Sequence, residues 1–308
     1  MFDVKDFGKV AVLMGGISAE RDVSLASGAA VLKGLCANGV DAHGIDASPQ
    51  NIGTLQAQGF DRAFIALHGR WGEDGVVQGA LEAVSLPYTG SGVLGCALAM
   101  DKVRTKQIWQ RLALPTPEFR VLKNTEDLDG LIYALGLPLF LKPAREGSSV
   151  GIAKVSHSQE LKPAYEQAAA VGDTVLAEQY IGGAELTIAI LNGETLPIIE
   201  LRTSNTFYDY QAKYESNDTQ YLCPASLPAE LEREISELSL RAFEALDCGI
   251  WGRVDLLLDD AQRPQLLEVN TVPGMTDHSL VPMAAAAAGI DFNSLVSEIL
   301  ATTLEVSA

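Results

Sequence analysis

The stretch LLEVNTVPGMTD, Leu266 to Asp277, is the one around which the rest of the chain is organised. Its first residues are apolar or β-branched and predict a strand. Glu268 and Asn270 lie two positions apart, so in a strand their side chains point to the same face. The largely apolar run WGRVDLLL, Trp251 to Leu258, lies just upstream across a short polar connection. The two runs together predict an antiparallel β-hairpin.

The predicted hairpin gathers polar side chains on one face. Its register pairs three sets of residues: Leu258 with Gln265, Asp255 with Glu268, and Arg253 with Asn270. Two carboxylates at directly opposed positions repel each other. A divalent cation such as Mg²⁺ offsets that repulsion, because it binds oxygen ligands and often accompanies a nucleotide. A metal–nucleotide site is one interpretation of this face, and an edge hairpin with an acidic face in water is the other.

Length and charge narrow the class of protein. The 308 residues predict two or three domains with a core large enough to need no disulfides. The net charge of -18 argues against broad nucleic-acid or anionic-membrane surfaces, which need basic patches. The four cysteines are widely spaced and predict buried, reduced thiols in a cytosolic protein. Neither a signal peptide nor a membrane span is expected.

The N-terminal third of the chain alternates strands and helices, which predicts an open α/β sheet. A strand at Val10 to Met14 leads through Gly15-Gly16 to a helix expected over Ser18 to Leu35. The glycine turn matches neither a P-loop nor a dinucleotide-binding fingerprint, so a Rossmann dehydrogenase is disfavoured. Glu20 falls in the first turn of this helix, where it either complements the helix dipole or holds an ammonium group.

Two later segments have the composition of loops that cover a ligand. Residues 145–151 (REGSSVG) are rich in small residues with free N–H groups, which suit phosphates as well as a plain hairpin turn. Lys142 precedes this loop and either snorkels to solvent or points into a site. Residues 203–223 show no periodicity but hold five aromatic residues, and they predict a lid that carries Lys213 and Tyr214.

Eight motifs, in this order and over essentially the whole chain, resemble the D-alanine–D-alanine ligases of the ATP-grasp superfamily. Each is modest alone, but their joint presence is highly specific. They are GGISAERDVSLASG (15–28), HGRWGEDG (68–75), PYTGSG (87–92), MDK (100–102), KPAREGSSVG (142–151), FYDYQAKY (207–214), GRVD (252–255) and LEVNTVPGMTDHSLVP (267–282).

The resemblance implies an α/β (α+β) architecture, a three-domain ATP-grasp fold with an N-terminal open parallel-sheet domain. The expected domains are an N-terminal substrate domain (1–100), a central ATP-grasp subdomain (101–184) and a C-terminal ATP-grasp subdomain with the metal site and lid (185–308). ATP is then expected between the central and C-terminal domains. The two D-alanines are expected between the first domain and the third.

The resemblance also implies roles for individual residues. The ATP phosphates are expected at Lys102, Lys142, Gly147 and Ser149, and the adenine and ribose at Glu178, Tyr180, Ile181, Glu185 and Leu267. Two Mg²⁺ ions, with Mn²⁺ as an alternative, are expected at Asp255, Glu268 and Asn270. The D-alanines are expected at Glu20, His68, Asn270, Gly274, Ser279 and Leu280. The expected catalytic group comprises Glu20, Ser148, Tyr214, Arg253, Gly274 and Lys213.

The implied activity is ATP-dependent ligation of two D-alanines for peptidoglycan precursor synthesis, through a D-alanyl phosphate, with release of ADP and phosphate. A cytoplasmic homodimer is expected, with no nucleic-acid or membrane partner. Two alternatives stay open: a D-alanine–D-lactate ligase on the same scaffold, and a nucleotide-binding protein without turnover. In the family, tyrosine at the position of Tyr214 accompanies D-alanine as second substrate, and phenylalanine accompanies D-lactate.

Overall fold

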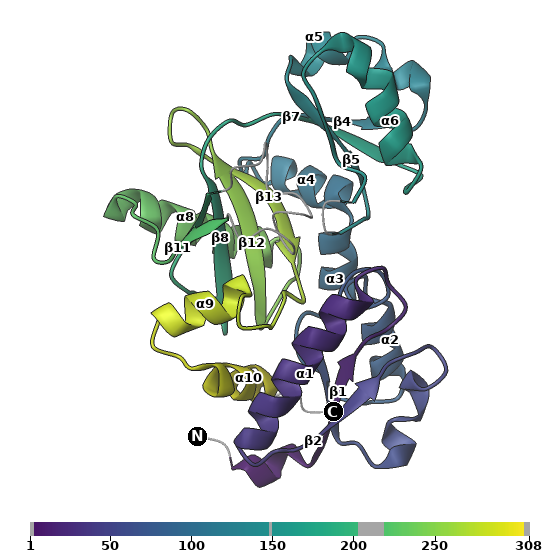
Figure 1. The fold of residues 1–308 in the computed structure, drawn as a ribbon, viewed down its shortest axis with the longest axis vertical. Helices are drawn as coiled ribbons and strands as arrows, with labels where there is room; N and C mark the ends of the chain where they lie inside the picture. Colours follow the sequence, from purple (N-terminus) through teal and green to yellow (C-terminus); the bar gives the residue numbers. More distant parts are fainter. Residues whose placement is uncertain (1–2, 148–149, 203–218, 305–308) are drawn as a thin grey trace.

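The computed structural model describes residues 3–147, 150–202 and 219–304. Within the described residues three β-sheets follow one another along the chain and lie along the long axis of the molecule (Figure 1). The sheet nearest the N-terminus lies at one end, the four-stranded sheet at the other, and the largest sheet between them. The mixed α/β fold expected from the sequence is confirmed.

The first sheet is parallel, with strand order β2 (Asp41–Asp46), β1 (Lys9–Met14) and β3 (Arg62–Ile65). Its central strand is buried because β1 has neighbours on both sides and α1 (Arg21–Ala37) packs against it. The chain then passes through α2 (Val76–Ala83), α3 (Val93–Met100) and α4 (Lys102–Arg111). The predicted open parallel sheet is therefore present.

The second sheet is antiparallel, and its order is β4 (Phe119–Leu122), β7 (Val175–Gln179), β5 (Leu139–Pro143) and β6 (Ala153–Val155). Two helices contribute to the apolar core of this unit, α5 (Leu131–Leu135) and α6 (Leu161–Ala169). Short 3₁₀ turns complete the described chain at Val4–Phe7, Ile52–Thr54, Gln56–Gln58, Thr125–Leu128, Ser158–Glu160 and Thr302–Leu304.

The third sheet follows the order β11 (Gln220–Leu222), β10 (Ile199–Arg202), β8 (Glu185–Leu191), β12 (Trp251–Leu258) and β13 (Pro264–Asn270), and β9 (Glu194–Thr195) pairs with β8. Helix α8 (Ala229–Glu244) packs on this sheet through an apolar stripe. Strand β11 corrects one expectation, because it lies inside the segment 203–223 that was expected to have no regular structure. Residues 203–218 of the expected lid lie outside the described residues.

The hairpin of β12 and β13 has the predicted facing pairs at its functional end. Arg253 lies opposite Asn270, and Asp255 lies opposite Glu268. The predicted pairing near the turn is wrong, because Gln265 pairs with Leu257. The register shifts by one residue after Glu268, so Leu267 is the extra residue of a β-bulge. At the bulge two consecutive residues, Leu267 and Glu268, are both half-buried, which interrupts the alternation of burial along β13.

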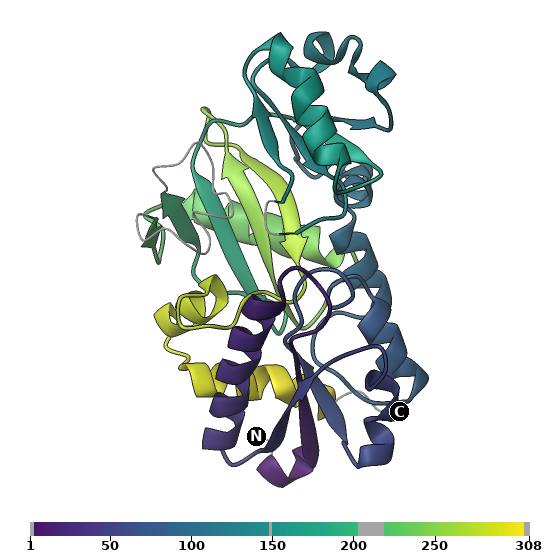
Figure 2. The same ribbon diagram turned by 45° about the vertical axis from the view of Figure 1, so that its right-hand side comes forward.

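The last two helices, α9 (Leu280–Ala287) and α10 (Phe292–Ala301), join the core of the first sheet. Helix α10 packs directly against α1, and both views show the two helices side by side (Figure 2). No single helix of the described chain is long and apolar enough to span a bilayer. The stretches Leu280–Ala287 and Phe292–Leu304 meet that test only as a pair, across a 104° bend.

The four cysteines are free thiols, but only two have the burial expected of all four. Cys96 and Cys248 are buried, whereas Cys36 is exposed and Cys223 is half-buried. Burial raises the pKa of both Cys96 and Cys248 to about 12. Since the thiolate is the reactive form, these two thiols are unreactive at neutral pH.

We therefore expect a thiol reagent at neutral pH to modify Cys36 readily in the native protein and to leave Cys96 and Cys248 untouched. Mass spectrometry of peptides after timed exposure to iodoacetamide measures this order. In denaturant all four cysteines should react, because unfolding removes the burial that raises the pKa. Fast native labelling of Cys248 would contradict the expectation.

Candidate active site

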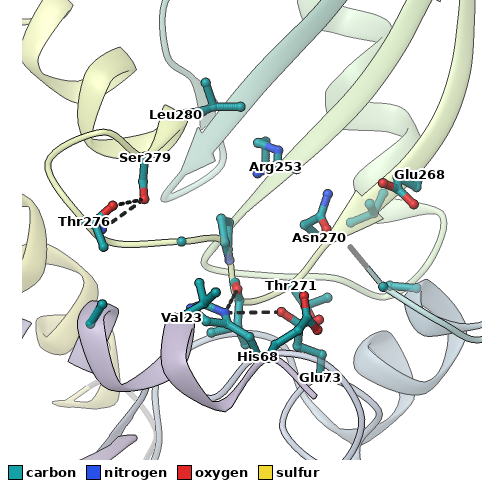
Figure 3. Close-up of a pocket in the computed structure, with 18 of the residues that line it drawn as sticks. Val23, His68, Glu73, Arg253, Glu268, Asn270, Thr271, Thr276, Ser279 and Leu280 are labelled. Carbon is teal, nitrogen blue, oxygen red and sulfur yellow. Dashed lines mark hydrogen bonds and ion pairs between the residues drawn. The ribbon is translucent and has the colours of Figure 1, made fainter. Parts of the chain in front are cut away.

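A cavity of about 700 Å³ lies between the first sheet's connections and the functional end of the hairpin. This volume is typical of a small-molecule site. Figure 3 shows Arg253, Asn270 and Glu268 on the hairpin side, opposite Val23 of α1 and the loop residue His68. Residues far apart in the sequence therefore line one space.

The carboxylate of Asp255 is held by side chains of three strands. Arg253 donates from Nε and Nη2 to its two oxygens at 2.8 Å each, a bidentate fork. Asn270 Nδ2 donates to Oδ2 at 3.0 Å, and Thr187 of β8 donates to Oδ1. Because the amide nitrogen of Asn270 faces Asp255, its amide oxygen is available as a ligand.

Glu268, the other facing carboxylate, pairs with a lysine of α4. Its Oε2 lies 3.2 Å from Lys102 Nζ, which also donates to the carbonyl of Glu146 at 2.9 Å. Lys102 and Arg253 therefore offset the two facing carboxylates from within the protein. The described residues contain no group of three or more His, Cys, Asp or Glu with metal-binding geometry. The oxygen donors of Asp255, Glu268 and Asn270 nevertheless match the preference of Mg²⁺.

A buried carboxylate lies between two lysines under the four-stranded sheet. Glu178 Oε1 lies 2.6 Å from Lys142 Nζ, and its Oε2 lies 2.6 Å from Lys106 Nζ. Burial alone would raise the pKa of Glu178, but the two ammonium charges outweigh burial and lower that pKa. Glu178 is therefore an ionised carboxylate with both oxygens engaged.

The connection from β7 to β8 carries the other residues expected near a nucleotide base. The Tyr180 N–H donates to the carbonyl of Pro138 at 3.3 Å, and its ring lies 5.8 Å from that of Phe140. Lys154 Nζ lies 3.9 Å from the centre of the Tyr180 ring. Ile181 follows in this connection, half-buried, and Glu185 is the first residue of β8.

Glu20 directly precedes α1, which begins at Arg21 and not at Ser18 as predicted. Ser18 accounts for the later start, because its Oγ accepts from the Glu20 N–H at 3.2 Å and donates to the distant carbonyl of His68 at 2.7 Å. Two glycines let backbone approach the Glu20 carboxylate. A Cβ at Gly147 would lie 3.1 Å from Oε2, and one at Gly69 would collide with it.

His68 connects the first domain to the turn after β13. Its Nδ1 lies 2.9 Å from the carbonyl of Val272, and its Nε2 lies 2.9 Å from Ser27 Oγ. Ser27 Oγ also accepts from the Met275 N–H at 3.1 Å. Residues 272–275 are thus held at both ends, and Gly274 lies between them.

Glu73 lies beside the contact between His68 and Val272, with its Oε1 3.6 Å from His68 Nδ1, and burial raises the pKa of the Glu73 carboxyl group.

The turn after β13 continues into α9 through Ser279. A Cβ at Gly274 would lie 2.8 Å from Ser279 Oγ, so glycine permits this close approach. Ser279 Oγ accepts from the Thr276 N–H at 2.9 Å, and Leu280 begins α9. The start of this helix faces the cavity, and helix N-termini favour anions such as a carboxylate.

The residues expected at the site that line the cavity are Glu20, His68, Lys102, Gly147, Arg253, Glu268, Asn270, Gly274, Ser279 and Leu280. Those that the structure describes but that do not line it are Lys142, Glu178, Tyr180, Ile181, Glu185, Asp255 and Leu267. Ser148, Ser149, Lys213 and Tyr214 lie outside the described residues. Sequence reasoning assigned no site role to Thr187, Ser27 or Lys106. Two of these had a local signal: Thr187 lies two positions after Glu185 in a strand, and Lys106 lies four positions after Lys102 in a helix.

Comparison with known proteins decides the family. Residues 47–91 match the family described as D-ala D-ala ligase N-terminus, and residues 108–301 match D-ala D-ala ligase C-terminus. A D-alanine–D-alanine ligase of Aromatoleum aromaticum is 56% identical over 294 residues, which cover 96% of this chain and 95% of that protein. One from Stutzerimonas stutzeri is 57% identical over 303 residues, covering 98% and 96%.

The chain belongs to the D-alanine–D-alanine ligase family. The crystal structure of a D-alanine–D-alanine ligase from Bacillus anthracis complexed with ATP has a TM-score of 0.84 at 35% identity, covering 97% of this chain and 98% of that chain. VanG D-Ala:D-Ser ligase from Enterococcus faecalis has a TM-score of 0.83 at 29% identity, covering 96% and 99%. The expected family and its ATP-grasp fold are confirmed.

Proposed function

We propose that this ligase-family chain joins two D-alanines into D-alanyl-D-alanine at the expense of ATP, for cell-wall peptidoglycan precursors. The observation that carries the proposal is the cavity itself. It places the Lys102–Glu268 pair, the Arg253 fork and the carboxylate of Glu20 around one space. Phosphate-binding cations, oxygen ligands and an ammonium-binding anion are the groups that such a reaction needs.

The first step moves the γ-phosphoryl group of ATP to the carboxylate of the first D-alanine, which gives an acyl phosphate and ADP. Lys102 and Lys142 bind phosphate oxygens in this proposal, and Glu20 orients the substrate ammonium group. Asp255, Glu268 and Asn270 would hold Mg²⁺, or Mn²⁺, which supplies charge neutralisation at the phosphates when bound. Glu178, Tyr180, Ile181, Glu185 and Leu267 would bind the adenine and ribose in this proposal.

In the second step the free amine of the second D-alanine attacks the acyl carbon, forms the C–N bond, loses a proton and expels phosphate. The tetrahedral intermediate carries an oxyanion, and Arg253 and the Gly274 N–H are the proposed donors. His68 holds the turn that contains Gly274. Ser279 and Leu280, at the start of α9, would receive the substrate carboxylate. Glu20, Ser148 and Tyr214 would form a hydrogen-bonded group, and Lys213 would approach the γ-phosphate.

One coupled assay tests the proposal. Phosphate release and product are measured with ATP and one of four substrate sets: D-alanine alone, D-alanine with D-lactate, D-alanine with D-serine, or L-alanine alone. D-alanine should give phosphate and dipeptide in equal amounts, and L-alanine should give neither. Nucleotide binding without phosphate release would favour the alternative of a non-catalytic binder, and a depsipeptide product would favour D-alanine–D-lactate ligase.

Tyr214 is proposed to select an amine as the second nucleophile. Wild type given D-alanine and D-lactate together at neutral pH should make almost only dipeptide. Tyr214→Phe should gain depsipeptide about tenfold or more, because an unsatisfied buried polar partner costs about 1–3 kcal/mol. Chromatography of the two products measures the ratio. An unchanged ratio in the variant would remove the selector role but leave the ligase proposal intact.

We also propose a cytoplasmic homodimer and the domain division 1–100, 101–184 and 185–308. Each of these three segments contains one of the three sheets, which supports the division. Light scattering at two protein concentrations measures the oligomeric state, and a mass of one chain at both would contradict the dimer.

A further inference from the structure

Lys106 is a charged side chain buried almost completely. Its exposed fraction is 1%, and it is among the largest fully buried side chains of the described chain. Its Nζ lies 2.6 Å from Glu178 Oε2, donates to Thr116 Oγ1 at 2.5 Å and lies 5.9 Å from the ring centre of Phe119. Burying an ammonium group is costly, so its retention requires an explanation beyond packing.

The charges of this buried group do not cancel. Lys106 and Lys142 together carry two positive charges, and Glu178, which they share, carries one negative charge. The adjacent Lys102–Glu268 pair is neutral and leaves the excess unchanged. Of the three side chains in the group, Lys142 is the most exposed, at 14% against 2% and 1%. The excess positive charge is therefore accessible to a ligand at Lys142, the most exposed of the three side chains.

Hydrogen bonds through Thr116 also connect Lys106 to the hairpin. Thr116 Oγ1 accepts from Lys106 and donates to the carbonyl of Leu266 at 2.7 Å. Leu266 directly precedes the bulge residue Leu267, and Glu268 follows it. Lys106, on α4, thus contacts the four-stranded sheet through Glu178 and the hairpin through Thr116. These are the two walls of the proposed nucleotide cleft.

We propose that Lys106 is a positioning residue for the nucleotide phosphates. Its ammonium group neutralises the carboxylate of Glu178, so the positive charge of Lys142 is available to bind phosphate. This inference rests on the proposed function. Without Lys106, Lys142 becomes the sole counter-ion of Glu178, and the group has no net charge to offer a phosphate. The effect is specific to phosphate, because adenosine carries no charge.

The test compares the affinities of ATP, ADP and adenosine by calorimetry. Lys106→Met keeps the length of the side chain and removes its charge. It should weaken ATP and ADP binding about tenfold or more and change adenosine binding less than about threefold. The matched control is Lys162→Met on α6, which removes an exposed lysine paired with Glu166 at 3.9 Å and should change none of the three affinities.

A second variant restores the charge balance. In Lys106→Met/Glu178→Gln, Lys142 again carries one excess positive charge, so the ratio of ATP to adenosine affinity should return toward wild type. If Lys106→Met alone fails to fold, the double variant is compared with Glu178→Gln, which has two excess charges and should bind ATP more tightly than the double variant.

A purely structural role for Lys106 predicts that ATP and adenosine weaken together, and that result would overturn the inference. Equal ATP affinity of the double variant and Glu178→Gln would overturn it as well. A wild type that binds ATP but forms no dipeptide would contradict only the proposed function. A wild type that binds no ATP would overturn both.

Discussion

Glu268→Gln is expected to lower turnover by at least about a hundredfold, which corresponds to about 2.7 kcal/mol. The substitution keeps the size of the side chain and a hydrogen-bond acceptor for Lys102, 3.2 Å away. It removes the charge that faces Asp255 across the hairpin and with it a carboxylate suited to Mg²⁺. The measurement is kcat and the apparent affinity for ATP over a series of Mg²⁺ concentrations.

The matched control for this substitution is Glu237→Gln. Glu237 lies on α8, outside the residues that line the cavity, and forms an exposed pair with Arg233 at 3.3 Å. Its loss should leave turnover within about twofold of wild type, since exposed ion pairs contribute little. Near-wild-type activity of Glu268→Gln at low Mg²⁺ would contradict the metal assignment.

Arg253→Ala is expected to cost about 2.7–4 kcal/mol in dipeptide formation, the loss typical of one oxyanion donor. Arg253 also binds Asp255 through two hydrogen bonds of 2.8 Å, so the variant removes a partner of that carboxylate. The two contributions act at different steps. A missing oxyanion donor spares acyl-phosphate formation, whereas a displaced Asp255 impairs it.

Trapping the acyl phosphate with hydroxylamine separates the two contributions in a single turnover. We expect the trapped intermediate to stay within about tenfold of wild type while dipeptide falls at least about a hundredfold. Arg263→Ala is the matched control, because Arg263 pairs with Asp259 at 2.8 Å in the turn of the same hairpin. If Arg253→Ala loses less than about tenfold in dipeptide, about 1.4 kcal/mol, Arg253 has only a structural role.

The hairpin shows which part of the fold can be predicted from the sequence. Counting residue for residue from an expected Leu258–Gln265 pair placed Asp255 opposite Glu268, and this facing pair is observed because the bulge at Leu267 offsets the error at the turn. The pairing of Gln265 was predicted one residue off. A bulge is an extra residue whose position depends on packing, here the burial of both Leu266 and Val269 in one core. No local pattern marks Leu267 as that residue.

At the site, too, some residues could be predicted from the sequence, whereas their contact partners could not. The family resemblance supplied residues such as Glu178 and Lys142, but the partners of those residues come from distant segments. Lys106 meets Glu178 across 72 positions of sequence, and His68 meets Val272 across 204. Such contacts follow from how the sheets pack and not from local periodicity. The start of α1 at Arg21 likewise depends on Ser18 binding the distant carbonyl of His68.

The packing of α10 on α1 has a consequence for biosynthesis. The ribosome makes Arg21–Ala37 long before Phe292–Ala301, yet Leu295, Val296 and Ile299 belong to the same apolar core as β1. The emerging N-terminal sheet therefore carries an uncovered apolar face until the last helices leave the exit tunnel. We expect nascent chains stalled before Phe292 to depend on chaperones, and full-length chains released from the ribosome to lose that dependence.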